Sequence, residues 1–289
     1  MEYNITGHTR LACLLGDPVE HSISPAMHNE AFRQLGIDCT YLAFPVGTDN
    51  LALVVEALKK MNVLGFNLTM PDKNLVCELC DELSAAASIG GAVNTVLNRE
   101  GKLIGYTTDG IGFMDACRAA GFDIIGKKMT LLGAGGAARA ILIQAALDGV
   151  REISVFSRKS SKWDQTEALI SKLRENTECV LNHFDYEDPS VLKDEIQDSA
   201  ILVNGTSVGM APNEEDSLIE DASWFTPGLM VYDVIYNPEE TKLLRMAKEA
   251  GCRTANGLYM LLYQGAAAFK IWTGQDMPVE LIKEKYFSR

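Results

Sequence analysis

A glycine-rich turn between an apolar run and a helix-like stretch constrains the fold of this chain more than any other sequence feature. The turn follows Leu131-Leu132 and reads Gly133-Ala134-Gly135-Gly136-Ala137-Ala138, which fits the spacing G-x-G-x-x-A of dinucleotide-binding units. In such a unit Gly133 allows a tight turn, Gly135 lets the backbone approach a pyrophosphate, and Ala138 permits close packing of helix on sheet. We therefore predict a Rossmann-type domain that binds a dinucleotide through Gly133, Ala134, Gly135, Gly136 and Ala137. The alternative is a glycine-rich turn that holds no ligand.

The segment after the next strand indicates which dinucleotide is bound. An NAD-specific site usually has an acid at the end of that strand, about 20 residues after the glycines. Here the strand predicted over 152–156 is followed by Ser157, Arg158 and Lys159, and no acid appears before Asp164. A planar guanidinium suits a 2′-phosphate because it donates two hydrogen bonds at once. The sequence favours NADP and leaves NAD open, and solvated surface charge is the alternative interpretation of these cations.

Short apolar runs alternate with longer helix-like segments, a pattern typical of α/β proteins with largely parallel sheets. The sequence pattern changes near residue 110, where a predicted helix is followed by a loop-like stretch, and regular strand–helix alternation begins at 129. A length of 289 residues is enough for two hydrophobic cores. We expect an N-terminal α/β substrate-binding and catalytic domain over 1–110, an NADP-binding Rossmann domain over 111–256, and C-terminal helices over 257–289 that return to the first domain.

Hydrophobic periodicity predicts the individual elements. In the first part of the chain we expect strands over 11–15, 41–46, 65–70, 93–98 and 102–106, and helices over 26–36, 50–61, 73–80, 84–90 and 110–120. In the second part we expect strands over 129–132, 152–156, 179–184, 201–204 and 229–234, helices over 136–148 and 163–174, and a mostly helical stretch over 241–286. The strands on either side of Arg99-Glu100-Gly101 are predicted to form a hairpin.

Charge and composition exclude several classes of protein. The formal net charge of -13 argues against nucleic-acid binding, which normally needs a basic face. No apolar run reaches the ~20 residues that cross a bilayer, and the first residues lack the pattern of a signal peptide. We expect a cytoplasmic protein whose 7 cysteines are reduced thiols.

No metal site is expected. Cys77 and Cys80 form a C-x-x-C, but a structural zinc site needs four ligands and the chain has no second such pair. Two residues at i and i+3 share one helix face, so two small buried cysteines are the simpler interpretation. The 4 histidines include no H-x-x-x-H or H-E-x-x-H, which disfavours a zinc hydrolase.

Polar side chains gather at the ends of predicted strands before residue 110. They lie in Ser22-Ile23-Ser24-Pro25, in the run from Asn67 to Lys73, in Gly91-Ala92-Val93-Asn94-Thr95 and in Thr107-Thr108-Asp109-Gly110. Ligands of open α/β sheets bind beyond the carboxyl ends of the strands. Hydroxyls, amides, a lysine and an aspartate at this edge would suit a small polyhydroxylated molecule, because a site built to bond hydroxyls rejects analogues that lack them.

These motifs, in this order and spacing, resemble the shikimate dehydrogenase family, including its quinate/shikimate dehydrogenase branch. The resemblance extends over essentially the whole chain. It includes S-x-S at 22–24, N-x-T-x-P-x-K at 67–73, G-A-x-N-T at 91–95, T-D-G-x-G at 108–112, the glycine-rich turn, and Y-Q-G-A at 263–266. It implies NADP-dependent, reversible reduction of 3-dehydroshikimate to shikimate.

The resemblance also implies roles for individual residues. Lys73 matches the catalytic lysine and Asp109 its partner, with either one open as the general base. The positions that match substrate-binding residues are Ser22, Ser24, Asn67, Thr69, Asn94, Tyr236 and Gln264. Cofactor binding is implied for the glycine-rich turn and for Ser157, Arg158 and Lys159, while Val234 and Gly257 match positions at the nicotinamide end.

The chain departs from the family pattern in places. Thr107 stands where many members have Asn, and either side chain can form a hydrogen bond. Ser157-Arg158-Lys159 replaces the common Asn-Arg-Thr, which keeps the arginine. Quinate-using relatives that accept NAD tend to have an acid where Ser160 stands, so this position also favours NADP.

Three alternatives are left open. The nearest is a quinate/shikimate dehydrogenase that uses NAD or NADP. Another is a non-catalytic nucleotide-binding regulator on the same fold, which should lack the Lys–Asp pair. The third is a folate-linked dehydrogenase, which would not need the S-x-S and Q-G-A elements together. The expected partner is a small-molecule substrate, with neither nucleic acid nor membrane, and a homodimer is left open.

Overall fold

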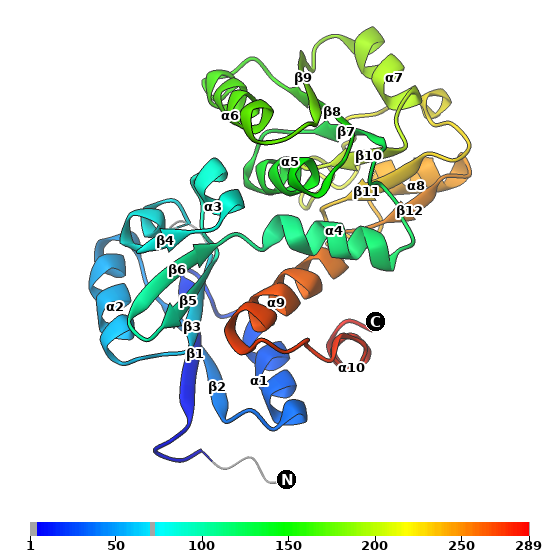
Figure 1. The fold of residues 1–289 in the computed structure, drawn as a ribbon. Helices are drawn as coiled ribbons and strands as arrows, with labels where there is room; N and C mark the ends of the chain where they lie inside the picture. The colour runs from blue at the N-terminus through cyan, green and yellow to red at the C-terminus, as the bar shows by residue number, and fades with distance from the viewer. Residues whose placement is uncertain (1–4, 70–72, 289) are drawn as a thin grey trace. The chain divides into compact units, whose positions relative to one another are not determined.

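The computed structural model describes residues 5–69 and 73–288 (Figure 1). The chain divides into two compact units. The first takes Met1–Thr108 and Leu262–Arg289, and the second takes Asp109–Leu261. Each unit is built around one six-stranded sheet. The α/β class expected from the alternating pattern is confirmed.

The sheet of the first unit has the strand order β2-β1-β3-β5-β6-β4. Its strands β2, β1 and β3 are parallel, and β5 is antiparallel to both β3 and β6. The predicted hairpin β5–β6 is confirmed, and Glu100 and Gly101 at its turn have φ of 52° and 87°. Two positive φ angles are the geometry that matches the twist of the flanking strands. The strands are β1 (Arg10–Gly16), β2 (Cys39–Pro45), β3 (Gly65–Leu68), β4 (Glu82–Leu83), β5 (Thr95–Arg99) and β6 (Lys102–Tyr106).

Helix α2 (Thr48–Lys60) covers part of this sheet through the apolar face that its sequence predicts. Leu51, Val55 and Leu58 are buried in one cluster with residues of β1, β3, β5 and β6, and Val54 packs against it. The other helices of this unit are α1 (Ser24–Leu35), α3 (Ala85–Gly90), the C-terminal part of α9 (Leu258–Thr273) and α10 (Val279–Tyr286). The helix predicted over 73–80 is shorter, a 3-10 helix at Leu75–Leu79.

A cluster of aromatic rings joins α1, β2 and α9. His28 stacks on Tyr41 with ring centroids 4.5 Å apart and contacts Phe269 and Trp272. Within the described residues neither ring nitrogen of His28 has a hydrogen-bond partner. Burial lowers the pKa of His28 to about 3, so its ring packs in this core as a neutral group.

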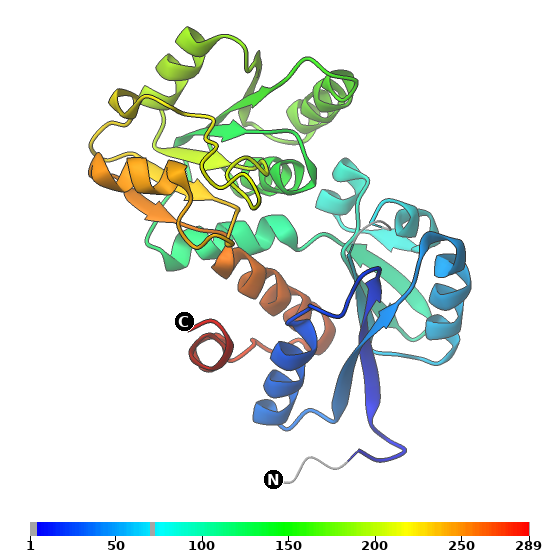
Figure 2. The same ribbon diagram turned by 180° about the vertical axis from the view of Figure 1, so that it is seen from behind.

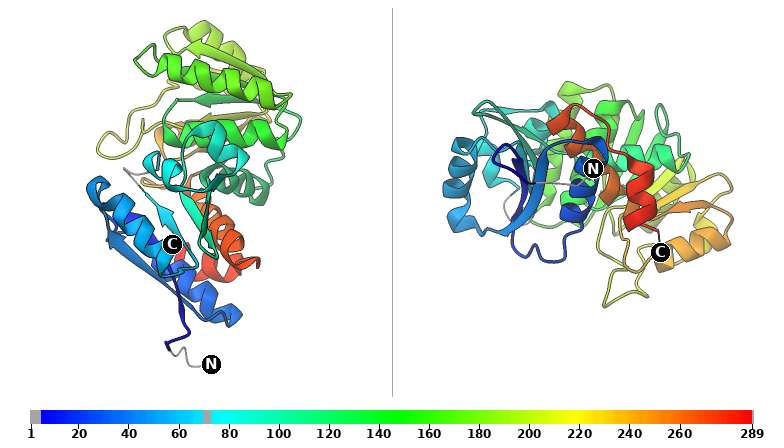
Figure 3. Two further views of the ribbon diagram at one scale, coloured as in Figure 1. Left: turned by 60° about the vertical axis from the view of Figure 1, so that its left-hand side comes forward. Right: turned by 90° about the horizontal axis from the view of Figure 1, so that it is seen from below.

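The sheet of the second unit has the order β12-β11-β10-β7-β8-β9, and all of its pairs are parallel. Read from β9, this is the Rossmann order 3-2-1-4-5-6, whose direction reverses between β7 and β10. Helices lie on both faces of the sheet (Figure 3). The strands are β7 (Lys128–Leu132), β8 (Glu152–Ser157), β9 (Val180–Asp185), β10 (Ile201–Asn204), β11 (Met230–Asp233) and β12 (Arg253–Ala255).

The helices of this unit are α4 (Asp109–Ala119), α5 (Gly136–Asp148), α6 (Trp163–Asn176), α7 (Pro189–Gln197) and α8 (Lys242–Glu249), with a 3-10 turn at Ala222–Trp224. Two elements differ from the sequence predictions. Helix α7 was not predicted, although Asp188 caps its start and a proline occupies its first turn. The stretch expected to be mostly helical contains β12, a short strand that pairs with β11.

Helix α10 lies beside α1 in the first unit (Figure 2). The link between them is Glu30, whose buried carboxylate accepts hydrogen bonds from Arg33, from Gln34 at 2.8 Å and from Lys285 of α10 at 2.9 Å. These bonds, with that from Arg33 the strongest, lower the pKa of Glu30 from 4.5 to about 2.

We expect Glu30→Gln to destabilise the protein at pH 7 and to lose this effect in acid. A carboxyl group whose pKa is depressed in the folded state stabilises that state above its unfolded pKa, and loses this contribution as the pH falls through the folded pKa. The gap between the urea midpoints of wild type and variant should therefore narrow from pH 5 to pH 3. Glu284→Gln, a charge-matched change on α10, should leave the midpoint unchanged. A gap that is equally wide at pH 7 and pH 3 would contradict the assignment.

Candidate active site

A buried network of hydrogen bonds lies at the carboxyl end of β3 in the first unit. The side-chain oxygen of Asn94 accepts from the backbone N–H of Thr108 at 2.8 Å and from the hydroxyls of Thr95 and Thr108 at 3.0 and 3.1 Å. The Thr108 hydroxyl also lies 3.5 Å from Oε1 of Gln264 on α9. Three distant segments of the chain therefore meet at Asn94, and two of the predicted substrate-binding residues, Asn94 and Gln264, share this network.

Asn67 supports the network from β3. Its amide nitrogen donates to the backbone oxygen of Asn94 at 3.1 Å and to the Thr95 hydroxyl at 2.9 Å. Its amide oxygen accepts from the hydroxyl of Tyr41 at 2.8 Å. Burial raises the pKa of Tyr41 well above 10, while a contact with the Ser24 side chain lowers it in part. Sequence reasoning missed Tyr41, because nothing local in β2 marks it as the partner of Asn67.

The other predicted substrate-binding groups of this unit follow the carboxyl ends of β1 and β3, on loops or at the start of a helix. Ser24 begins α1, and its backbone N–H donates to the Ser22 hydroxyl at 3.2 Å. Thr69 follows β3, and its N–H donates to the oxygen of Leu15 at 3.0 Å. All three side chains are half-buried, as groups that reach a ligand must be. Tyr236 belongs to the second unit, where it is 44% exposed.

A hydrogen bond fixes the backbone of Lys73. Its carbonyl oxygen accepts from the N–H of Val93 at 2.8 Å, so the lysine lies beside the loop that contains Asn94 and leads to β5. Met70, in the strand predicted over 65–70, and Pro71, in the motif at 67–73, lie outside the described residues. Asp109 is the first residue of α4, in the second unit, and is half-buried.

The glycine-rich turn connects β7 to α5 as its spacing predicts. Gly133 has a φ of 107°, a conformation open to glycine but strained for other residues. A Cβ added at Gly135 or Gly136 would meet no atom within 4 Å. Packing therefore does not require glycine at these two positions. The open space there, at the start of α5, fits the approach of a pyrophosphate to the helix N–H groups.

Close packing of helix on sheet is visible at Ala138. A Cβ built on Gly205, just after β10, would lie 2.8 Å from the Cβ of Ala138. Only two very small residues fit at this crossing, which lies at the reversal of strand order between β7 and β10. In α/β sheets this point is where ligands bind.

The segment after β8 presents the predicted cations. Arg158 and Lys159 are exposed, and Nζ of Lys159 lies 3.3 Å from a carboxylate oxygen of Asp185 at the end of β9. The hydroxyl of Ser157 lies 2.8 Å from Nε2 of His183, and Nδ1 of that ring lies 2.6 Å from Glu167. No sequence motif marks His183 or Glu167 as site residues.

Val234 and Gly257 lie against each other in the second unit. A Cβ added at Gly257 would come within 1.9 Å of the backbone oxygen of Val234, so glycine is required there. Next to them, Asp233 is fully buried and accepts from Asn204 at 3.0 Å and from Thr241 at 2.8 Å. Burial raises the pKa of Asp233. This network fixes the end of β11, from which Val234 continues.

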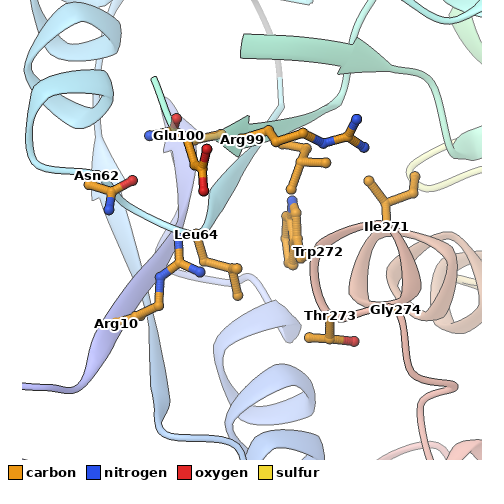
Figure 4. Close-up of a pocket in the computed structure, with 11 residues that line it drawn as sticks. Arg10, Asn62, Leu64, Arg99, Glu100, Ile271, Trp272, Thr273 and Gly274 are labelled. Carbon is orange, nitrogen blue, oxygen red and sulfur yellow. The ribbon is translucent and has the colours of Figure 1, made fainter. Parts of the chain in front are cut away.

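A hollow of about 500 Å³ lies at the opposite end of the first sheet, where β1 and β3 begin (Figure 4). It contains none of the predicted site residues. The guanidinium groups of Arg10 and Arg99 lie on different sides of Trp272 (Figure 4). They do not converge on one point, as the binding of a small anion would require, and Glu100 shares the rim.

Further features of the described residues concern metal binding, membrane spans and the cysteines. Residues 5–69 and 73–288 contain no group of three or more acidic, histidine or cysteine side chains placed to hold a metal ion. Across the same residues, no helix has the length and apolar character of a membrane span. The 7 cysteines are free, and Cys77 and Cys80 are half-buried.

Comparison with known proteins connects these sites to one family. Residues 14–96 match the shikimate dehydrogenase substrate binding domain, and residues 257–285 match the shikimate 5'-dehydrogenase C-terminal domain. The shikimate dehydrogenase (NADP⁺) of Listeria monocytogenes serotype 4b is 52% identical, over 98% of this chain and 97% of its own length. A quinate/shikimate dehydrogenase of Escherichia coli is 44% identical, over 97% and 98%.

Solved structures agree with the sequence relatives. A crystal structure of shikimate 5-dehydrogenase from Listeria monocytogenes, in complex with shikimate and NAD, superimposes with a TM-score of 0.94 at 52% identity. The match covers 97% of each chain.

The network around Asn67 yields a test of stability. We expect Asn67→Leu to destabilise the protein by about 2 kcal/mol, because it takes the acceptor from the buried hydroxyl of Tyr41 and a donor from the buried hydroxyl of Thr95. Adding Tyr41→Phe removes one of these orphaned groups. The double variant should therefore be less destabilised than the sum of the two single variants, as measured by urea denaturation. Strict additivity would show that the Tyr41–Asn67 bond contributes nothing.

Proposed function

This chain belongs to the shikimate dehydrogenase family, and on that premise we propose how its residues interconvert 3-dehydroshikimate and shikimate with NADP. The reaction oxidises a CH–OH group to a carbonyl and, in reverse, reduces that carbonyl, as in the relatives that carry the family name. The observation that carries the residue-level proposal is the meeting of Asn94, Thr108 and Gln264 in one hydrogen-bond network. Hydroxyl and amide groups held in this way match a small molecule rich in hydroxyls.

The two units have different proposed roles in binding. We assign substrate binding to the first unit and to Tyr236 of the second, with the C-terminal helices from 257 onward belonging to that function, and cofactor binding to the second unit. The proposed substrate-binding residues are Ser22, Ser24, Asn67, Thr69, Asn94, Tyr236 and Gln264. We assign the two serines to the substrate carboxylate and the amides to its hydroxyls.

Lys73 and Asp109 are the proposed catalytic residues. When bound, the cofactor accepts or supplies the hydride at C3 of the substrate. During reduction a proton must reach the oxygen of the former carbonyl, and during oxidation the same proton must leave. Lys73 can move this proton as acid and base. Alternatively, Lys73 stabilises the developing oxyanion as a fixed cation, an effect worth several kcal/mol in comparable sites, and Asp109 moves the proton.

The residues of the second unit fit a dinucleotide. The open space over Gly135 and Gly136 leaves room for a pyrophosphate at the start of α5. We assign Gly133 through Ala137 to the pyrophosphate, Val234 and Gly257 to the nicotinamide end, and Ser157, Arg158 and Lys159 to the adenosine ribose. The exposed guanidinium of Arg158 is the proposed clamp for the 2′-phosphate of NADP.

Quinate and NAD remain a second candidate pair. The Escherichia coli relative acts on quinate as well as shikimate by its name, and the Listeria crystal structure holds NAD. Cytoplasmic location is part of the proposal, supported by 7 free cysteines, since thiols stay reduced in that compartment. A homodimer is a further proposal, to be tested by light scattering.

The first experiment measures initial rates at 340 nm for the oxidation of shikimate and of quinate, each with NADP and with NAD. We expect shikimate with NADP to give the highest kcat/KM. Comparable or higher rates with quinate or NAD would assign the chain to the dual-specificity branch. Activity with none of the four pairs would contradict the proposed reaction.

Replacing the lysine tests its role in catalysis. We expect Lys73→Ala to lower kcat for shikimate oxidation by about 100-fold or more, with little change in KM, because assistance with proton transfer is lost only in the transition state. Lys60→Ala, which removes an exposed lysine of α2 paired with Glu56, should leave both constants unchanged. Near-normal turnover of Lys73→Ala would exclude it from the chemistry.

A further inference from the structure

Within the second unit, a series of hydrogen bonds runs from Ser157, at the proposed ribose position, through His183 to Glu167. The Ser157 hydroxyl at the end of β8 lies 2.8 Å from Nε2 of His183 on β9, and Nδ1 of His183 lies 2.6 Å from Oε1 of Glu167 on α6. His183 stands opposite Val155 in the parallel pair, so Ser157, two residues further along, is its diagonal neighbour on the same face. The pairing of β8 with β9 therefore brings serine and histidine together.

The histidine is locked in place. Its side chain is only 2% exposed, and its ring stacks on Trp163 with centroids 3.7 Å apart. Trp163 and Glu167 are four residues apart on α6, so both point to one side of the helix. Among the described residues, the hydrogen bonds of the two nitrogens of His183 go to Ser157 and Glu167. His183 differs from His28, whose nitrogens have no partner in the described part of the chain.

The chemistry of the three side chains determines which atom donates in each of these hydrogen bonds. A carboxylate only accepts, so Nδ1 of His183 carries a proton and donates to Glu167. In the neutral ring Nε2 has no proton, and the Ser157 hydroxyl must donate to it. In the protonated ring Nε2 donates to the oxygen of Ser157, whose own proton is then released to donate elsewhere. The state of His183 thus decides whether Ser157 offers a donor or an acceptor to a ligand.

The two nicotinamide cofactors place different demands on this hydroxyl. The 2′-phosphate of NADP presents acceptor oxygens and negative charge, so it needs donors and nearby positive charge. The 2′-hydroxyl of NAD can donate or accept, so either orientation of Ser157 satisfies it. Of the neighbouring charged groups, Lys159 is paired with Asp185, and Arg158 is exposed.

We propose that His183, held by Glu167, is a positioning residue for NADP and orients the Ser157 hydroxyl toward the 2′-phosphate. This inference rests on the proposed placement of Ser157 in the cofactor site. It adds Glu167 on α6 and His183 on β9 to the residues that determine the choice between NADP and NAD. Neither residue touches the cofactor in this scheme, and both act through Ser157.

The experiment compares kcat/KM for NADP and for NAD in shikimate oxidation by the full-length protein. His183→Phe keeps an aromatic ring against Trp163 and removes both hydrogen bonds. We expect it to lower kcat/KM for NADP by about 5- to 10-fold through KM, the size of one lost charge-assisted hydrogen bond. The values for NAD, kcat with saturating NADP, and KM for shikimate should stay within about twofold, because a hydroxyl partner tolerates both orientations.

A double-mutant cycle tests whether His183 acts through Ser157. In a Ser157→Ala background, His183→Phe should cause no further loss with NADP. Glu167→Gln guards against misfolding of the histidine variant, since Glu167 is 43% exposed, and it should lower NADP use in the same direction. Glu175→Gln makes the same charge change at an exposed position of α6 and should have no effect.

The possible failures can be told apart. Equal losses with NADP and NAD, no loss in His183→Phe, or a full additional loss in the Ser157→Ala background would overturn the role of His183. Unchanged NADP use in Ser157→Ala itself would instead show that the cofactor site was placed wrongly. Absence of shikimate oxidation in the wild type would reject the proposed function, before any variant is compared.

Discussion

Buried side-chain amides impose the strongest constraint on the first unit. An amide removed from water costs several kcal/mol unless its donors and acceptors are bonded. Asn67 and Asn94 meet this requirement only when β2, β3, β5 and the segment that enters α4 are all in place, because their partners are Tyr41, Thr95 and Thr108. The same bonds that satisfy the core therefore fix the orientation of Asn94. A rigid frame of this kind keeps the groups of a binding site within the narrow tolerance that recognition needs.

Small residues play the corresponding part in the second unit. Gly205 and Ala138 allow α5 to approach the ends of β7 and β10, and Gly257 allows the chain to pass against the carbonyl of Val234. In each place a single added carbon would collide with its neighbour. Gly135 and Gly136 differ, because the space over them is open. The glycines of this unit thus fall into two groups: some are required by packing, and others leave room for a ligand.

Two buried histidines illustrate how surroundings decide the use of one side chain. His28 lies among aromatic rings, and burial lowers its pKa to about 3, so it behaves as a neutral part of the core. His183 is also buried, but it lies between a hydroxyl and a carboxylate. A buried imidazole with both nitrogens bonded fixes the orientation of both partners.

The sequence by itself determined the features that depend on neighbouring residues. The glycine-rich turn, the hairpin at Glu100-Gly101 and the apolar face of α2 could be predicted, because each follows from local spacing and backbone freedom, and the order of the motifs identified the family. Only the tertiary structure decided the short strand β12, which exists through its pairing with β11. It also decided the partnership of Tyr41 with Asn67 and of Ser157 with His183 and Glu167. These contacts join residues 16 to 26 positions apart in the chain, and no local pattern encodes them, because they form only when separate strands and helices pack against one another.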